Sequence, residues 1–200
     1  MHKEVRMARY IALSVCVTSF VLLVGCLSCC EAVTGAVVGG GQHHALVGEL
    51  EKVDTEAKKI TIRAADGTEH AVSFGERTMV QGLEGTAKAA DLAGKEGSRV
   101  VVHYTGAAGR ETADRIDVFG HDTLNTTEGT LTQVDKAGHK VVVKTSDGVD
   151  ETYDLGRDSA IDTKDGLVDL AHFTGKEGDH VIVYHTEEGG RKVVHLLKRL

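Results

Sequence analysis

The feature that most constrains the fold is an internal repeat. Residues 94–105, a Gly-Lys-Glu-Gly turn followed by a valine-rich run, recur 81 residues later as residues 175–186. At the same offset, and without a gap, residues 48–119 align on residues 129–200. Self-similarity at a fixed period indicates that one structural unit occurs twice in the chain. The chain is therefore expected to hold two copies of one small domain.

Both copies carry the same order of strand and turn signals. In the first copy, the three-residue step from Leu50 to Val53 breaks strict alternation and predicts a bulged strand. A β-branched strand follows at residues 59–63. Asp66-Gly67 is the strongest short-range signal for a hairpin, and we expect a tight primed turn there. The second copy repeats these signals 81 residues later.

The rest of each copy is expected to complete a small barrel. In the first copy we predict a third strand at 70–74, a short strand at 78–80, a helical turn at 89–92, a fourth strand from residue 100 and a last strand through residues 113–118. Short strands joined at Gly or Asp, with no proline and no long helix, are typical of a strongly curved antiparallel sheet. The predicted fold class is all-β: two tandem five-stranded OB-like or SH3-like barrels over residues 45–120 and 121–200.

Composition limits the core and the partners. The sequence has no Trp, four Phe and four Tyr, so the core must be aliphatic. All four cysteines lie in the first 30 residues, so both barrels are expected to fold without disulfides. The net charge of −7 argues against nucleic acid as a partner, because phosphate binding needs clustered Lys and Arg. Barrels this small are near the lower limit for a stable core, so we expect them to pack together.

The N-terminus has the layout of a secretory signal. Residues 1–9 are basic and residues 10–25 are uncharged and mostly apolar. Leu23-Val24-Gly25-Cys26 resembles the lipobox of bacterial lipoproteins. The resemblance implies that residues 1–25 are removed and that Cys26 is lipidated, which would anchor the protein to a membrane through buried methylenes.

The segment after the lipobox sets the expected location. Residues 26–44 are rich in small residues and predict a flexible tether. Leu27 follows the cysteine, and by resemblance to lipoprotein sorting this directs the protein to the outer membrane, facing the periplasm, in a two-membrane bacterium. Two alternatives stay open. The uncharged run of residues 10–30 is long enough to remain as an uncleaved anchor, and cleavage without lipid would give simple secretion.

The order of motifs in each copy carries a further resemblance. This order is similar to that of a bacterial family of secreted OB-like barrels of uncharacterised function. The motifs are, in order, G-x-L-x-x-V-D, K-I-T-I, D-G, L-x-G-K-E-G-x-x-V-V-V and a closing G-R hairpin. The outline also resembles the periplasmic copper and silver efflux chaperones, which bind metal through a His, a Met-x-Met pair and a capping Trp. Met79 stands alone here and Trp is absent, so this resemblance implies the fold without that metal site.

Histidines are the remaining candidates for chemistry. In the second copy, the candidate ligands for a metal ion are His172, His180, His185 and His195. Parity places His180 and His185 on opposite faces, and we expect His195 to lie across the hairpin near Ile182, so the ligands do not obviously converge. No nucleophile–base pairing or phosphate loop is recognisable, and no cofactor is expected.

The sequence therefore predicts a non-catalytic, lipid-anchored envelope protein that acts as an interaction or structural module for an unknown envelope partner. The alternative is a periplasmic metal-binding or metal-stress protein that uses the histidines of the second copy. A weaker alternative is an enzyme whose site spans both barrels.

The lipid anchor can be tested directly. Mass spectrometry of the mature protein is expected to find Cys26 as the N-terminal residue with a fatty-acid modification, because the lipobox marks that cysteine for diacylglyceryl transfer. A mature chain that lacks this mass on Cys26 would contradict the prediction.

Overall fold

The computed structural model describes residues 42–82, 85–107, 109–121 and 123–200. Within these residues the chain is all-β apart from one short 3₁₀ turn, which confirms the predicted fold class. The predicted signal segment, Cys26 and the predicted tether up to residue 41 lie outside the described residues. No helix in the described part is both long enough and apolar enough to cross a membrane.

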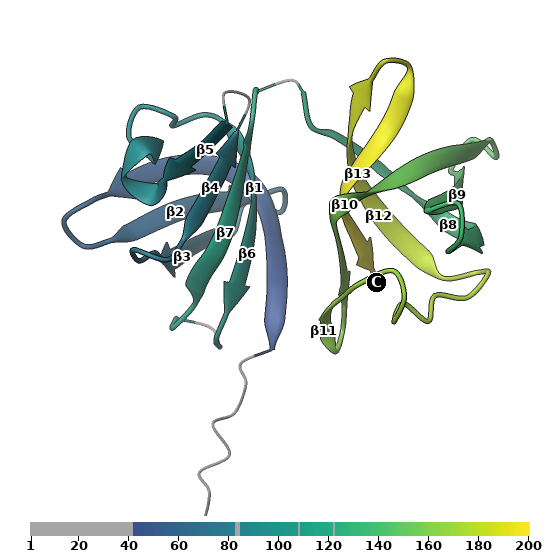
Figure 1. The fold of residues 1–200 in the computed structure, drawn as a ribbon, viewed down its shortest axis with the longest axis horizontal. Coiled ribbons are helices and arrows are strands. Elements are labelled where there is room, and N and C mark those ends of the chain that lie inside the picture. The colour runs from purple at the N-terminus through teal and green to yellow at the C-terminus, as the bar shows by residue number, and fades with distance from the viewer. Residues whose placement is uncertain (1–41, 83–84, 108, 122) are drawn as a thin grey trace, which may run out of the picture. The chain divides into compact units, whose positions relative to one another are not determined.

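The first half forms a closed five-stranded barrel with two further strands beside it (Figure 1). Around the ring β1 pairs with β2, β2 with β3, β3 with β7, β7 with β6, and β6 with β1. The short strands β4 and β5 extend the sheet from β7. The strands are β1 (His43–Asp54), β2 (Lys59–Ala64), β3 (Glu69–Ser73), β4 (Met79–Gly82), β5 (Gly85–Lys88), β6 (Arg99–Thr105) and β7 (Thr112–Phe119).

The second half forms a six-stranded sheet with the same kind of ring. Here β8 pairs with β9, β9 with β10, β10 with β13, β13 with β12, and β12 with β8, while β11 extends β10. The long strand β10 therefore takes the places that β3 and β4 take in the first half. The strands are β8 (Asn125–Asp135), β9 (Lys140–Thr145), β10 (Asp150–Thr163), β11 (Gly166–Val168), β12 (His180–Glu188) and β13 (Arg191–Arg199).

Bulges occur at equivalent places in the two sheets. The β1–β2 register shifts between Leu50 and Lys52, and the β8–β9 register shifts between Leu131 and Gln133. This confirms the bulge that the sequence predicts. A bulge adds one unpaired residue and increases the local twist, which a small closed barrel needs.

The Gly-Lys-Glu-Gly turn is hydrogen-bonded to the strand at this bulge. Gly97 N–H donates to Leu50 O at 2.8 Å, and Leu50 N–H donates to Ser98 O at 2.9 Å. The same pair recurs in the second half, where Gly178 N–H donates to Leu131 O at 2.8 Å and Leu131 N–H donates to Asp179 O at 2.8 Å. Gly97 has a φ of 85°, a conformation that favours glycine. The longest shared stretch of sequence is therefore a structural turn.

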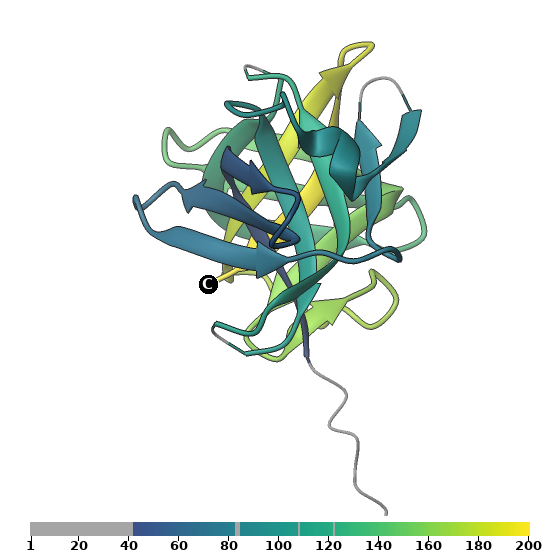
Figure 2. The ribbon, with the colours of Figure 1, turned by 90° about the vertical axis from the view of Figure 1, so that its left-hand side faces the viewer.

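Each sheet encloses an aliphatic core. In the first, Leu50, Ile60, Val100, Val102 and Ile116 are fully buried. The predicted helical turn is confirmed as η1 (Ala89–Leu92), which is drawn as a short coil in Figure 2, and its Leu92 belongs to this core. In the second, Phe173 takes the position equivalent to Leu92 and is 1% exposed.

A third apolar cluster joins the outer faces of the two sheets. It contains Val47, Val101 and Phe119 from the first half and Leu196 from the second, with Tyr184 packed beside them. Val101 alternates with the core residues Val100 and Val102, so it points away from its own barrel. The expectation that the two barrels pack together therefore holds in this cluster.

Two details differ from the sequence predictions. The turn after β2 is not a primed two-residue turn, because Gly67 has a φ of 82° while Asp66 is not among the described residues with positive φ. Instead Ala64 N–H donates to Thr68 O and Gly67 N–H donates to Ala64 O, so a three-residue loop ends in a left-handed glycine. The predicted tether also ends earlier than residue 44, because His43 and His44 belong to β1 and pair with β6.

Gly48 offers a test of the barrel corner. A Cβ there would lie 2.3 Å from Arg63 O, so Gly48→Ala must move β1 away from β2. We expect the free energy of unfolding to fall by about 1–3 kcal/mol in urea titrations. Gly75→Ala is the matched control, because its Cβ would meet nothing within 4 Å. Equal unfolding midpoints for the two variants would contradict the steric argument.

Candidate functional site

The four predicted histidines lie in different environments. His172 is exposed in the loop after β11, where its Nδ1 lies 2.7 Å from Asp169 Oδ1. His180 is exposed at the start of β12. His185 is buried on β12, and His195 is half-buried on β13. No three His, Cys, Asp or Glu side chains among the described residues form a group that could hold a metal ion. Metal binding by these histidines remains a prediction from the sequence.

The position predicted for His195 is wrong. It does not lie near Ile182, which pairs with Lys198, but at a register shift opposite Tyr184 and His185. The physical reason is the register of the hairpin, in which Glu188 pairs with Arg191 and residue 195 therefore comes opposite Tyr184. A bulge in β13 at His195 then shifts the pairing of the residues beyond it by one. The first half has the same irregularity between β6 and β7, at the residue equivalent to His195, which is Asp114.

His185 closes one end of the second barrel within a polar group. It is 3% exposed, and its Nε2 lies 3.2 Å from Thr127 Oγ1. The Tyr153 ring packs edge-on against it at 5.0 Å. Tyr153 donates its hydroxyl hydrogen to Glu151 at 2.5 Å, and Lys192 Nζ lies 2.6 Å from the other oxygen of Glu151. We call Thr127, Glu151, Tyr153, His185 and Lys192 the barrel-end cluster.

The charges of this cluster follow from its burial. Burial lowers the pKa of His185, and the nearby Lys192 ammonium lowers it further. Burial and the hydrogen bond to Glu151 raise the pKa of Tyr153. The hydrogen bond from Lys192 lowers the pKa of Glu151. The cluster at neutral pH is therefore an ion pair over a neutral Tyr–His pair, and its polar groups mainly satisfy one another.

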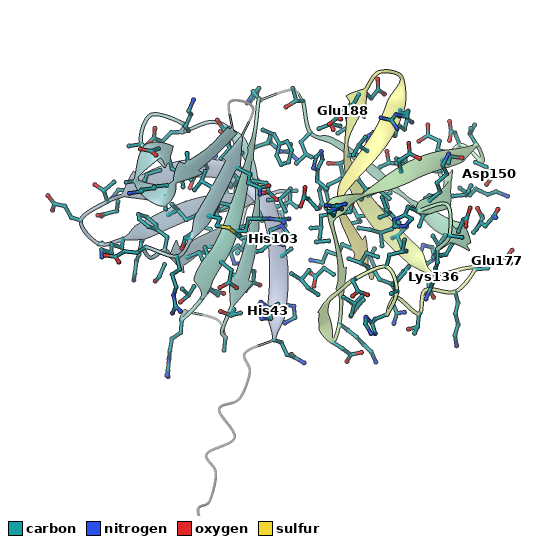
Figure 3. All side chains as sticks on the ribbon, in the orientation of Figure 1. His43, His103, Lys136, Asp150, Glu177 and Glu188 are labelled. Carbon is teal, nitrogen blue, oxygen red and sulfur yellow. The ribbon has the colours of Figure 1, made fainter. Side chains whose placement is uncertain are left out.

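A second polar group lies on the outer face of the first barrel. Arg115 Nη2 lies 3.0 Å from Asp117 Oδ2 and 2.7 Å from His103 Nε2. Because a guanidinium can only donate, His103 Nε2 acts as an acceptor in that contact. Arg115 Nη2 also donates to Asp158 O at 3.0 Å, which ties β7 to β10 (Figure 3, His103 labelled). We call His103, Arg115 and Asp117 the outer-face cluster.

The outer-face cluster borders a cavity of about 590 Å³. Its lining is rich in carboxylates, and Phe119 and His195 form an aromatic wall with ring centroids 4.6 Å apart. The carboxylates are Asp117, Asp158, Glu187 and Glu188. Glu187 and Glu188 are exposed in the β12–β13 hairpin, where Figure 3 labels Glu188, whereas Asp117 is only 8% exposed. We call this space the acidic cavity.

The acidic cavity carries net negative charge. Among the described residues, Asp158, Glu187 and Glu188 make no ion pair, and Arg115 offsets only the charge of Asp117. Burial lowers the pKa of His195, so its imidazole is neutral at neutral pH and adds no positive charge. Asp117 Oδ1 is buried and has no hydrogen-bond partner in the described part of the chain. The cavity can therefore attract cations and accept hydrogen bonds.

The cavity has few of the parts that catalysis needs. Thr186 Oγ1 lies 2.9 Å from His195 Nε2, which brings a hydroxyl to an imidazole. The same hydroxyl also donates to Glu188, and no described carboxylate is hydrogen-bonded to His195. Nucleophilic catalysis usually requires a third group that orients the base. Binding is the chemistry that the arrangement supports best.

Sequence reasoning missed the acidic cavity and the outer-face cluster. One signal was present, because His103, Arg115 and Asp117 occupy the non-core face of two neighbouring strands. The partners from the second half, Asp158 and His195, lie far along the chain and give no local pattern. On β1, His43 Nδ1 lies 3.3 Å from Asp114 Oδ2 and His44 Nδ1 lies 3.4 Å from Asp162 Oδ1.

Comparison with known proteins gives only distant likenesses. No family model and no curated protein matches the sequence. Among solved structures, apo-CusF from Escherichia coli is similar at 11% identity with a TM-score of 0.30, covering 38% of this chain and 87% of that chain. Ag(I)-bound CusF is similar at 11% identity with a TM-score of 0.31, covering 38% and 97%. We draw nothing about function from likenesses this distant.

The buried histidines predict a pH dependence of stability. The pKa of His185 in the folded protein lies below its ordinary value of about 6.5, so the unfolded chain binds the proton first. Stability should therefore be full above about pH 7 and fall as the pH drops from there towards 5.5. Urea unfolding across this range is expected to show a shallower pH slope for His185→Phe, with a residual slope from His195. An unchanged slope in the variant would contradict the assignment.

Proposed function

We propose that this protein is a non-catalytic binding module of the bacterial cell envelope, anchored by lipid on Cys26, and that the acidic cavity is its contact site. The observation that carries this proposal is a contrast between its polar groups. In the barrel-end cluster the charged groups Glu151 and Lys192 pair with each other, and only His185 Nδ1 lacks a partner among the described residues. The acidic cavity instead has three carboxylates without an ion-pair partner in that part of the chain. Groups left unpaired around a concave surface are available to a partner.

The charge of the protein supports a partner that is not a nucleic acid. The net charge is −7, and the concave surface is itself acidic. Phosphate groups would be repelled there, because phosphate binding depends on clustered Lys and Arg. The same field would attract positively charged surfaces and raise their association rate.

The position of the acidic cavity also supports a binding role. Its walls come from both halves of the chain, with Asp117 and Phe119 on β7 and Glu187, Glu188 and His195 on β12 and β13. A partner that occupies it would contact both sheets at once. A lipid anchor on Cys26 would keep this surface close to a membrane, where an envelope protein could reach it.

Site-specific crosslinking in cells tests this proposal. A photoreactive residue in place of Glu187, at the acidic cavity, is expected to capture one discrete envelope partner. The same residue in place of the exposed Glu177, on the distant Gly-Lys-Glu-Gly turn, is the control and should not capture that partner. Equal capture from both positions would contradict the proposed site. Sub-micromolar binding of Cu(I) or Zn(II) at a fixed stoichiometry would instead favour the metal-binding alternative.

A further inference from the structure

The acidic cavity also limits the chemistry of what it binds. The cavity is within the size range of small-molecule sites, at about 590 Å³. Its negative charge selects a cation. However, no three of its His, Asp or Glu side chains, nor any others in the described ranges, converge on one point as a metal ion requires. Charges that are spread out in this way fit a ligand whose own positive charges are spread out.

The hydrogen bonding of the Asp117 carboxylate favours one type of cationic group over another. Its Oδ2 accepts from Arg115 Nη2 at 3.0 Å, so that oxygen is occupied. Oδ1 is buried and has no partner among the described residues, and Asp117 as a whole is 8% exposed. A guanidinium binds carboxylate best through both oxygens, whereas an ammonium group can bind one oxygen as a point charge. A single unpartnered oxygen therefore favours an ammonium group.

The aromatic wall suits the chain that carries such a group. Phe119 is 8% exposed and packs against the His195 ring at 4.6 Å, which gives the cavity an apolar side. Methylene groups bury favourably against such a surface, and an ammonium near a ring face gains a cation–π interaction. Glu187 and Glu188 lie at the rim, where they can pair with a second ammonium group.

We propose that the acidic cavity binds two or more primary ammonium groups joined by aliphatic chains. One ammonium binds at Asp117 and another at the Glu187–Glu188 rim, with the aliphatic part along Phe119 and His195. The source is either a lysine-rich segment of a protein partner or a free linear polyamine, which share this chemistry. This inference rests on the proposed function, because it assigns a ligand class to the same cavity.

Titration of the full-length protein in non-ionic detergent at low salt tests the ligand class. The probes are a fluorescent tetra-lysine peptide, the matching tetra-arginine peptide and spermidine. We expect tetra-lysine to bind more tightly than tetra-arginine, and the double variant Glu187→Gln/Glu188→Gln to weaken tetra-lysine binding by about threefold to thirtyfold. Spermidine binding with the same sensitivity would identify a free polyamine as a source, and binding of the peptide alone would identify a protein segment.

A matched control separates this site from general attraction to an acidic protein. Glu177→Gln/Asp150→Asn removes the same two charges from exposed positions outside the acidic cavity, both labelled in Figure 3. It is expected to leave tetra-lysine binding within twofold of the parent. Equal weakening in both double variants, tighter binding of tetra-arginine, or no binding of either tetra-lysine or spermidine would overturn the ligand assignment. Crosslinking from Glu187 that persists in those cases would leave the proposed function standing with another ligand.

Discussion

Both sheets depend on the hydrogen bonds between a bulged strand and a glycine turn. At Leu50 and Leu131 the strand gains an extra residue, and its backbone groups need partners outside the regular ladder. The turn that contains Gly97 or Gly178 supplies them. The bulge lets a short sheet curve into a ring, and the turn fixes the start of the next strand of that ring. The close match between the two copies here reflects the need to satisfy these backbone groups.

A scaffold held by backbone bonds leaves its outer side chains free to differ. The outer-face cluster of His103, Arg115 and Asp117 has no polar counterpart for two of its members, because the equivalent residues in the second copy are Tyr184, Leu196 and Lys198. Tyr184 and Leu196 contribute to the apolar cluster between the sheets instead. Divergence of the two outer faces therefore produces a surface that is apolar in one part and charged in another. The acidic cavity lies at the edge of that surface.

Burial and charge balance support the proposed binding role. Arg115 neutralises Asp117 at the inner side of the acidic cavity, while the rim carboxylates stay unpaired and exposed. Burial lowers the pKa of both His185 and His195, so neither gains a proton readily at neutral pH. A surface of this kind attracts cations over a distance through its net charge, and in the proposed binding mode Asp117 and Phe119 select among them at short range.

The sequence by itself determined the local and repeated features of this protein. The bulge at Leu50, the helical turn at residues 89–92, the inward faces of the strands and the all-β class all follow from spacing and residue type. The turn type at Asp66-Gly67 was not predicted, because two and three-residue loops share the same glycine signal. The position of His195 was not predicted either, because it depends on the exact register of the β12–β13 hairpin, in which Glu188 pairs with Arg191.

Only the tertiary structure decided where the polar side chains of distant strands meet. Asp117, Asp158 and Glu188 are well separated in sequence, and each alone looks like an ordinary surface carboxylate. Their approach depends on how the two outer faces pack, through Val101, Phe119 and Leu196. Apolar packing is non-directional, so no spacing rule in the sequence encodes which charged groups it brings together. The acidic cavity is therefore a property of the folded chain.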